Sequence, residues 1–206
     1  MNWLDRILLL ATGLAAIYII WRLYGRYTQK KALHDVYYLG GFVVLLVSGL
    51  LLIFLGWGIL ASPYVLTVAT LIPLGISMGL MNQFLPEYKK YYSWFALAGL
   101  LAIAVTSIGG MPLKKLAVPL FHGVAGMIIF LLPIKLSMDK KVPAGFWWVG
   151  IGGMLIGIGG IALAFVVSGS QLLFLSHEVI LTILAPILLL MTLAYTWGFD
   201  KDVQAG

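Results

Sequence analysis

Cysteine is absent from the 206 residues of this chain. Its absence excludes disulfides, iron–sulfur clusters, covalent attachment of haem c and thiolate zinc sites. Cysteine usage often indicates whether a protein works in an oxidising or a reducing compartment, and here it leaves the compartment open.

Charged residues are also scarce. They make up 10% of the chain, whereas hydrophobic residues make up 62%. A soluble domain has about 25% charged and about 45–50% apolar residues. A core of this size cannot bury such an apolar excess, so lipid must solvate much of it. The basic folded surface that a nucleic-acid-binding protein requires is absent, because the loops between the apolar runs are short.

Seven apolar runs are long enough to cross a bilayer, whose hydrocarbon core of about 30 Å requires about 20 helical residues. Backbone groups in lipid must be hydrogen-bonded within the segment, so unbroken runs without strand-like alternation predict helices. The sequence therefore predicts an all-α polytopic membrane protein, with residues 1–206 forming one integral membrane domain. The predicted spans are roughly 7–24, 36–58, 64–84, 91–110, 116–136, 146–168 and 172–197.

Basic residues are distributed unequally between the two sides of these spans. With the N-terminus outside, ten Lys and Arg residues are cytoplasmic and three lie outside. The ten lie in 22–35, 85–90, 135–145 and the C-terminal tail, and the three are Arg6, Lys114 and Lys115. Because cytoplasmic loops are enriched in Lys and Arg, we expect the N-terminus outside and the C-terminus in the cytoplasm of a prokaryotic cell. Asp5 and the basic residues after the first run argue for a retained span rather than a cleaved signal peptide.

A weak internal repeat runs through the chain. The stretch "WFALAGLLAI" at 94–103 aligns with "WVGIGGMLIG" at 148–157, and nearly the same offset places His122 on His177. The stretch "YLGGFVVLLV" at 38–47 resembles an earlier copy. These similarities predict a lone first helix followed by three tandem helix hairpins, although glycine-rich apolar helices also resemble one another by composition alone.

Two of the three histidines lie in predicted spans near the outer face. His122 and His177 begin spans that run in the same direction, and neutral imidazoles from two helices can hold a b-type haem between them. The sequence thus predicts that His122 and His177 ligate a haem iron. The other predicted haem contacts are Gly123 and Gly126, which leave room for a flat ring, and Lys114 and Lys115, which could pair with propionates.

Other roles for these residues stay open. Glu178, next to His177, is a candidate for a proton relay near the outer face, where quinol oxidation releases protons, and quinone is then a second candidate cofactor. The histidines could also bind another metal, or act only as helix caps or interfacial side chains. His34, at the cytoplasmic side, receives no assigned role.

The histidines favour a membrane electron-transfer subunit, by analogy with the architecture of cytochrome b-like proteins. Such a subunit would pass electrons between quinol and a redox protein at the outer face, beside other membrane subunits. A small transporter or channel is the alternative, and a structural or assembly subunit is the second alternative. The transporter hypothesis meets one difficulty, because most charged residues are expected in loops and almost no buried charge remains for a coupling ion. A stand-alone enzyme is disfavoured, because no nucleophile-and-base motif is found.

Overall fold

The computed structural model describes residues 1–168 and 177–205, with side chains described in 1–160 and 178–205. This part of the chain is helical and contains no strand. The elements are α1 (Trp3–Lys30), α2 (Leu33–Leu55), the 3₁₀ helix η1 (Trp57–Ala61), α3 (Pro63–Ala69), α4 (Leu71–Phe84), α5 (Lys89–Ile108), α6 (Lys114–Met138), α7 (Trp147–Ser168) and α8 (His177–Ala205).

Six stretches of helix are long and apolar enough to cross a bilayer within the described residues: α1, α2, the joined α3 and α4, α5, α6, and Glu178–Ala205 of α8. α7 is a further apolar helix, whose described side chains cover Trp147–Gly160. The all-α prediction is confirmed for the described residues, and the apolar helices indicate a multi-pass membrane protein in contact with lipid.

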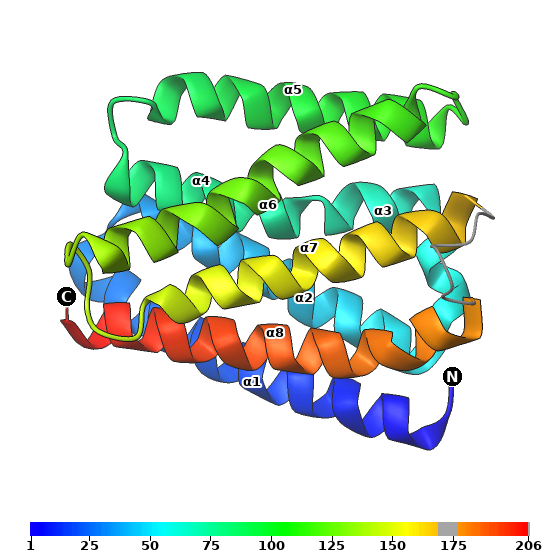
Figure 1. Ribbon diagram of the computed structural model, residues 1–206, viewed down its shortest axis with the longest axis horizontal. Coiled ribbons are helices and arrows are strands. Elements are labelled where there is room, and N and C mark those ends of the chain that lie inside the picture. Colours follow the sequence, from blue (N-terminus) through cyan, green and yellow to red (C-terminus); the bar gives the residue numbers. More distant parts are fainter. Residues whose placement is uncertain (169–176, 206) are drawn as a thin grey trace.

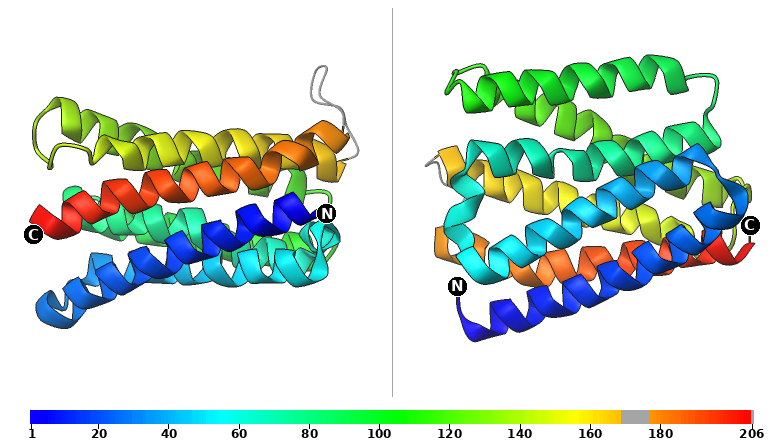
Figure 2. Two further views of the ribbon diagram at one scale, coloured as in Figure 1. Left: turned by 90° about the horizontal axis from the view of Figure 1, so that it is seen from below. Right: turned by 180° about the vertical axis from the view of Figure 1, so that it is seen from behind.

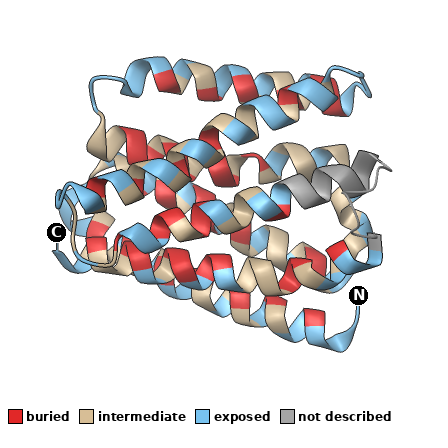
Figure 3. Ribbon diagram, in the orientation of Figure 1, coloured by how far each residue is buried: buried red, intermediate tan, exposed pale blue. Residues whose placement is uncertain are grey.

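The helices lie side by side along the long axis, and the two chain termini lie at opposite ends of the bundle (Figures 1 and 2). α1 packs against both α2 and α8, so the first and last helices are neighbours. α7 packs against both α6 and α8 and lies between them (Figure 1). α5 is peripheral and contacts α3, α4 and α6. Buried residues follow the inward faces of the helices, and their outer faces are exposed (Figure 3).

One predicted span is divided. The expected helix over 64–84 is formed by α3 and α4, which meet at Thr70. Pro73 explains the division, because proline has no backbone N–H to donate to the carbonyl of Ala69. Thr70 keeps helical dihedral angles (φ −58°, ψ −26°), so the division is a kink within one passage rather than a loop.

Helix ends extend beyond the predicted apolar runs, and this corrects the placement of several charges. α1 continues to Lys30, so Arg22 and Arg26 lie on a helix and not in a loop as predicted. α8 likewise continues through Asp202 to Ala205. Hydropathy marks the segment that lipid solvates, whereas a helix continues into the polar interface wherever good helix formers such as Arg and Lys follow.

A cluster of fully buried rings lies at the centre of the largest group of core residues. We call it the aromatic cluster, and its members are Tyr38, Phe42, Phe146, Tyr195 and Phe199, each 0% exposed. Its ring centroids lie close together, at 4.6 Å for Tyr38 and Phe199 and 5.6 Å for Phe42 and Phe199. The cluster joins α2, α8 and the residue that precedes α7.

Candidate functional site: a buried ion network

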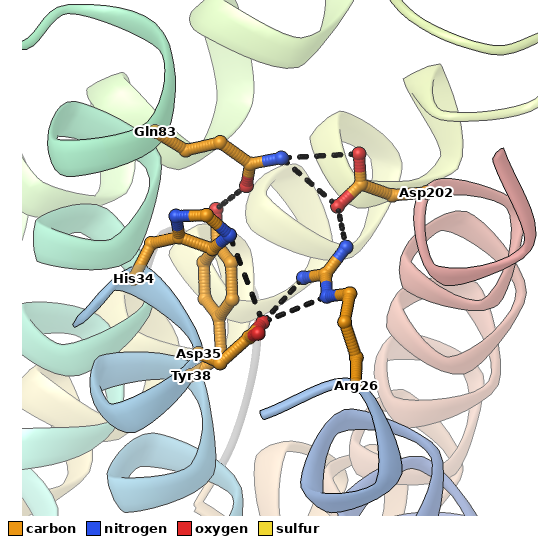
Figure 4. A network of polar contacts seen from close by, with 6 residues as sticks. All are labelled: Arg26, His34, Asp35, Tyr38, Gln83 and Asp202. Atoms are coloured by element: carbon orange, nitrogen blue, oxygen red, sulfur yellow. Dashed lines mark hydrogen bonds and ion pairs between the residues drawn. The ribbon is translucent and has the colours of Figure 1, made fainter. Parts of the chain in front are cut away.

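Four helix ends meet at the end of the bundle that carries the C-terminus, and we call it the basic end. It contains the ten Lys and Arg residues that the sequence assigns to one side of the membrane. Six polar side chains converge there in what we call the ion network (Figure 4). They are Arg26 of α1, His34, Asp35 and Tyr38 of α2, Gln83 of α4, and Asp202 of α8.

Arg26 lies at the centre of the ion network, between two carboxylates. Its Nε and Nη2 donate to Oδ1 of Asp35 at 2.9 and 2.5 Å, and its Nη1 donates to Oδ2 of Asp202 at 2.6 Å. The side chains of Arg26, Asp35 and Asp202 are only 5%, 0% and 8% exposed. These ion pairs are therefore shielded from water, where removing one partner would leave a costly unpaired charge.

Two neutral side chains extend the network to α4. Nε2 of Gln83 donates to both carboxylate oxygens of Asp202 at 3.1 Å, and the hydroxyl of Tyr38 donates to Oε1 of Gln83 at 2.8 Å. The network thus connects α1, α2, α4 and α8 directly (Figure 4). Because Tyr38 also belongs to the aromatic cluster, the ion network is in direct contact with the apolar core.

The charges of the network do not balance. One buried guanidinium faces two buried carboxylates, so the buried members carry an excess negative charge when His34 is neutral, and the exposed Lys30 lines the same hollow. Oδ2 of Asp35 is buried and has no hydrogen-bond partner among the described residues. Nε2 of His34 lies 3.8 Å from Oδ1 of Asp35, close enough for an ion pair if the imidazole is protonated.

A second ion pair ties α1 to α8 one turn away from Arg26. Nη1 of Arg22 lies 2.6 Å from Oδ1 of Asp200, with side chains 24% and 15% exposed. The hydroxyl of Tyr18 lies within hydrogen-bond distance of both groups. Two successive Arg–Asp pairs therefore join the first and last helices, and of these two only the pair Arg26–Asp202 is buried.

A hollow lies at each end of the bundle, and the two hollows differ in volume and in the residues that line them. At the basic end a hollow of about 230 Å³ is lined by Arg26, Lys30, His34, Gln83, Pro143, Asp202 and Ala205. At the opposite end a larger hollow of about 450 Å³ is lined by Met1, Asn2, Asp5, Trp57, Glu178, Leu181 and Thr182. Four residues of the ion network, Arg26, His34, Gln83 and Asp202, line the smaller hollow.

The predicted haem residues lie away from the ion network. His122 lies on α6 with Nδ1 buried and without a hydrogen-bond partner in the described part of the chain. A side chain at Gly123 or Gly126 would meet nothing within 4 Å, and Lys114 and Lys115 begin α6.

The second predicted ligand cannot be placed beside the first. His177 begins α8, and its side chain lies outside the described residues. α7 separates the two helices that carry the histidines. Glu178, the predicted proton relay, lines the hollow at the opposite end. Within the described residues no group of three or more His, Asp and Glu side chains is arranged to hold a metal ion. Haem ligation by His122 and His177 stays a prediction.

The ion network was not predicted from the sequence, because Arg26 was expected in a loop and almost no buried charge was expected. That expectation is wrong for Arg26, Asp35 and Asp202. Comparison with known proteins gives no independent assignment, since no family model, curated protein or solved structure matches the chain.

Proposed function

We propose that the protein is a small membrane transporter or channel, and that the ion network closes its basic end. The buried position of Arg26 between Asp35 and Asp202 carries this proposal. Charged side chains that are buried in a protein are costly unless they are paired, and in membrane proteins such residues commonly mark substrate or ion pathways. The network also supplies the buried charge whose expected absence weakened the transporter hypothesis.

A closed pathway is further supported by the difference between the two ends. At the basic end, ion pairs and hydrogen bonds join four helices, and the aromatic rings behind them pack in tilted or edge-to-face arrangements. At the opposite end, the hollow between α1, η1 and α8 contains two carboxylates, Asp5 and Glu178. This arrangement fits a transporter that is open to one side and closed to the other, with the buried ion pairs as the contacts that break and reform.

We further propose seven crossings, with the N-terminus outside and the C-terminus in the cytoplasm. The termini lie at opposite ends (Figure 1), which requires an odd number of crossings. α7 has 22 residues, enough for about 33 Å at about 1.5 Å per residue. Successive helix pairs α2 and α4, α5 and α6, and α7 and α8 each pack together, as three tandem hairpins would. The excess of Lys and Arg supports a cytoplasmic location for the basic end.

Flux through reconstituted vesicles tests the proposed function. The protein is placed in liposomes, proton flux is followed with entrapped pyranine, and glycerol entry is followed by light scattering. Asp202→Asn removes one buried charge while keeping the side-chain shape, so we expect it to raise the permeability to at least one probe several-fold above that of the unmodified protein. Permeability equal to that of empty vesicles for both the unmodified protein and Asp202→Asn would contradict the proposal.

A matched control separates loss of the network from a general effect of charge. Lys135→Ala also removes a charge at the basic end, but Lys135 is 75% exposed and pairs with Asp139 on the surface. Exposed pairs contribute little to stability, so this variant is expected to match the unmodified protein. A leak of equal size in Lys135→Ala would show that the effect is not due to the buried network.

A further inference from the structure

We propose that Asp35 is a proton-binding site, loaded from the basic end through His34, and that the bound proton loosens the ion network. The role of this proton as a coupling ion depends on the proposed transport function. The site itself depends only on the surroundings of Asp35.

The charge balance of the network gives the first reason. Arg26 is shared by Asp35 and Asp202, and the side chain of Asp35 is 0% exposed. A buried excess charge is unfavourable unless it is compensated. A proton on Asp35 would leave one guanidinium and one carboxylate, Arg26 and Asp202, as a balanced pair.

The geometry of the carboxylate gives the second reason. Arg26 donates two hydrogen bonds to Oδ1 of Asp35, whereas Oδ2 is buried and has no partner among the described residues. Oδ2 can therefore take up a proton without losing an existing hydrogen bond.

His34 gives this buried carboxylate a connection to solvent. Its side chain is 21% exposed, lines the hollow at the basic end, and lies 3.8 Å from Oδ1 of Asp35 (Figure 4). Imidazole gains and loses protons near neutral pH. In the proposed step, hydronium at the basic end protonates His34, whose Nε2 lies 3.8 Å from Oδ1 of Asp35. The imidazolium then moves within hydrogen-bond distance of the unpartnered Oδ2 and transfers that proton to it. An O–H bond forms on the carboxyl group, an N–H bond breaks, and His34 returns to its neutral form.

The groups around His34 and Asp35 come from α2 itself and from three neighbouring helices. Burial opposes a positive charge on the imidazole most strongly, Arg26 and Lys30 of α1 also oppose it, and Asp35 and Asp202 favour it. Tyr38 and Gln83, on α2 and α4, contribute only neutral polar groups. Because burial and two cations oppose the charged form of the imidazole, it is suited to pass a proton on rather than to hold it.

The direction of the effect follows from the hydrogen bonds of Arg26. Arg26 attracts the ionised carboxylate of Asp35 through opposite charge as well as through hydrogen bonds, and protonation of Asp35 removes that charge attraction. Protonation of Asp35 would therefore weaken the contact between α1 and α2, while Asp202 keeps α1 attached to α8. Acidification at the basic end should accordingly favour the state in which α2 has separated from α1 and α8.

A distance measurement between two spin labels tests this inference, and the cysteine-free chain allows clean labelling. The labels are attached at Leu33→Cys on α2 and at Gln204→Cys on α8, and both positions are exposed. The distance distribution is measured by double electron–electron resonance in nanodiscs at about pH 8 and about pH 5, on either side of the imidazole range. We expect a shift to longer distances at acidic pH.

Two single variants decide whether Asp35 is responsible. Asp35→Asn, which resembles the protonated carboxyl group, should give the longer distances at both pH values. Asp139→Asn removes a surface carboxylate that is 36% exposed, and this variant should respond to pH like the unmodified protein. The proposal would be overturned if the unmodified Asp35 protein gave identical distance distributions at both pH values. It would also be overturned if the Asp35→Asn protein still responded to pH.

The role of His34 is tested by the rate of the pH-dependent change, and this test does not depend on whether the protein transports anything. After a pH jump, a fluorophore on Leu33→Cys should report a slower change in His34→Gln, and an unchanged rate would exclude His34 as the relay. A pH-dependent distance without any flux through vesicles would leave the proton site standing and refute the transport function. Flux without a pH-dependent distance would refute only the proton site.

Discussion

Arg26→Ala is expected to lower the free energy of unfolding by about 3–5 kcal/mol, because it leaves Asp35 and Asp202 as buried carboxylates without a countercharge. The measurement is denaturant unfolding in detergent, followed by circular dichroism. Arg22→Ala is the matched control on the same helix. Its partner Asp200 is partly exposed, so the expected loss is about 0–1 kcal/mol.

A neutral replacement of all three charged residues, Arg26, Asp35 and Asp202, which we call the triad, makes this prediction more specific. Replacing Arg26 by Met, together with Asp35→Asn and Asp202→Asn, removes every charge of the triad and keeps similar volumes. We expect this triple variant to recover most of the stability lost in Arg26→Ala, since the loss arises from unpaired charge rather than from the missing side chain. If Arg26→Ala were no more destabilising than Arg22→Ala, water would have to reach the carboxylates of Asp35 and Asp202. That result would contradict the burial of the triad.

Gly75→Ala is expected to destabilise the protein by about 1–3 kcal/mol, because there is no room for a methyl group between α4 and α2. A Cβ atom at Gly75 would lie 2.9 Å from the backbone oxygen of Tyr37 and 3.1 Å from the backbone nitrogen of Gly41. Backbone atoms cannot move aside by changing a rotamer, so the two helices would have to separate. The same unfolding measurement checks the result.

Gly40→Ala is the control for this prediction, because it lies beside Gly41 on α2 and a Cβ there would meet nothing within 4 Å. Alanine favours a helix over glycine by up to about 1 kcal/mol, so Gly40→Ala should leave the stability unchanged or raise it slightly. Equal effects of Gly75→Ala and Gly40→Ala would mean that α2 and α4 are not in such close contact.

The positions of the helices could be predicted from the sequence because a helix that crosses lipid must be apolar over about 20 consecutive residues. The helix ends could not be predicted as well. α1 continues past the predicted end at 24 to Lys30, because Arg and Lys residues extend the helix without being apolar. This difference of less than two turns decided whether Arg26 was assigned to a loop or to the interior.

A signal for the ion network was present in the spacing of residues. The buried residues of α1 include Ile19, Leu23 and Arg26, so Arg26 continues the core-facing row at helical spacing. Asp202 likewise follows Tyr195 and Phe199 at intervals of four and three residues. A charged residue that continues a buried row is a candidate for a buried charge, and hydropathy averaged over a window conceals it.

The partners within the network could not be predicted in the same way. Gln83 and Asp202 are 119 residues apart, and their contact depends on how α4 and α8 are rotated against α1 and α2. That rotation is set by close contacts such as the one at Gly75, which require the three-dimensional structure.

The most direct test of the closed basic end is the reactivity of a single cysteine placed behind it. Thr192 on α8 is 0% exposed, between the two ends of the bundle and on the same helix face as Tyr195 and Phe199. With the ion network intact, Thr192→Cys should not react with a membrane-impermeant maleimide applied at the basic end. Adding Asp202→Asn should make it react. Rapid reaction with the network intact, or none after Asp202→Asn, would contradict a basic end that is held closed by buried ion pairs.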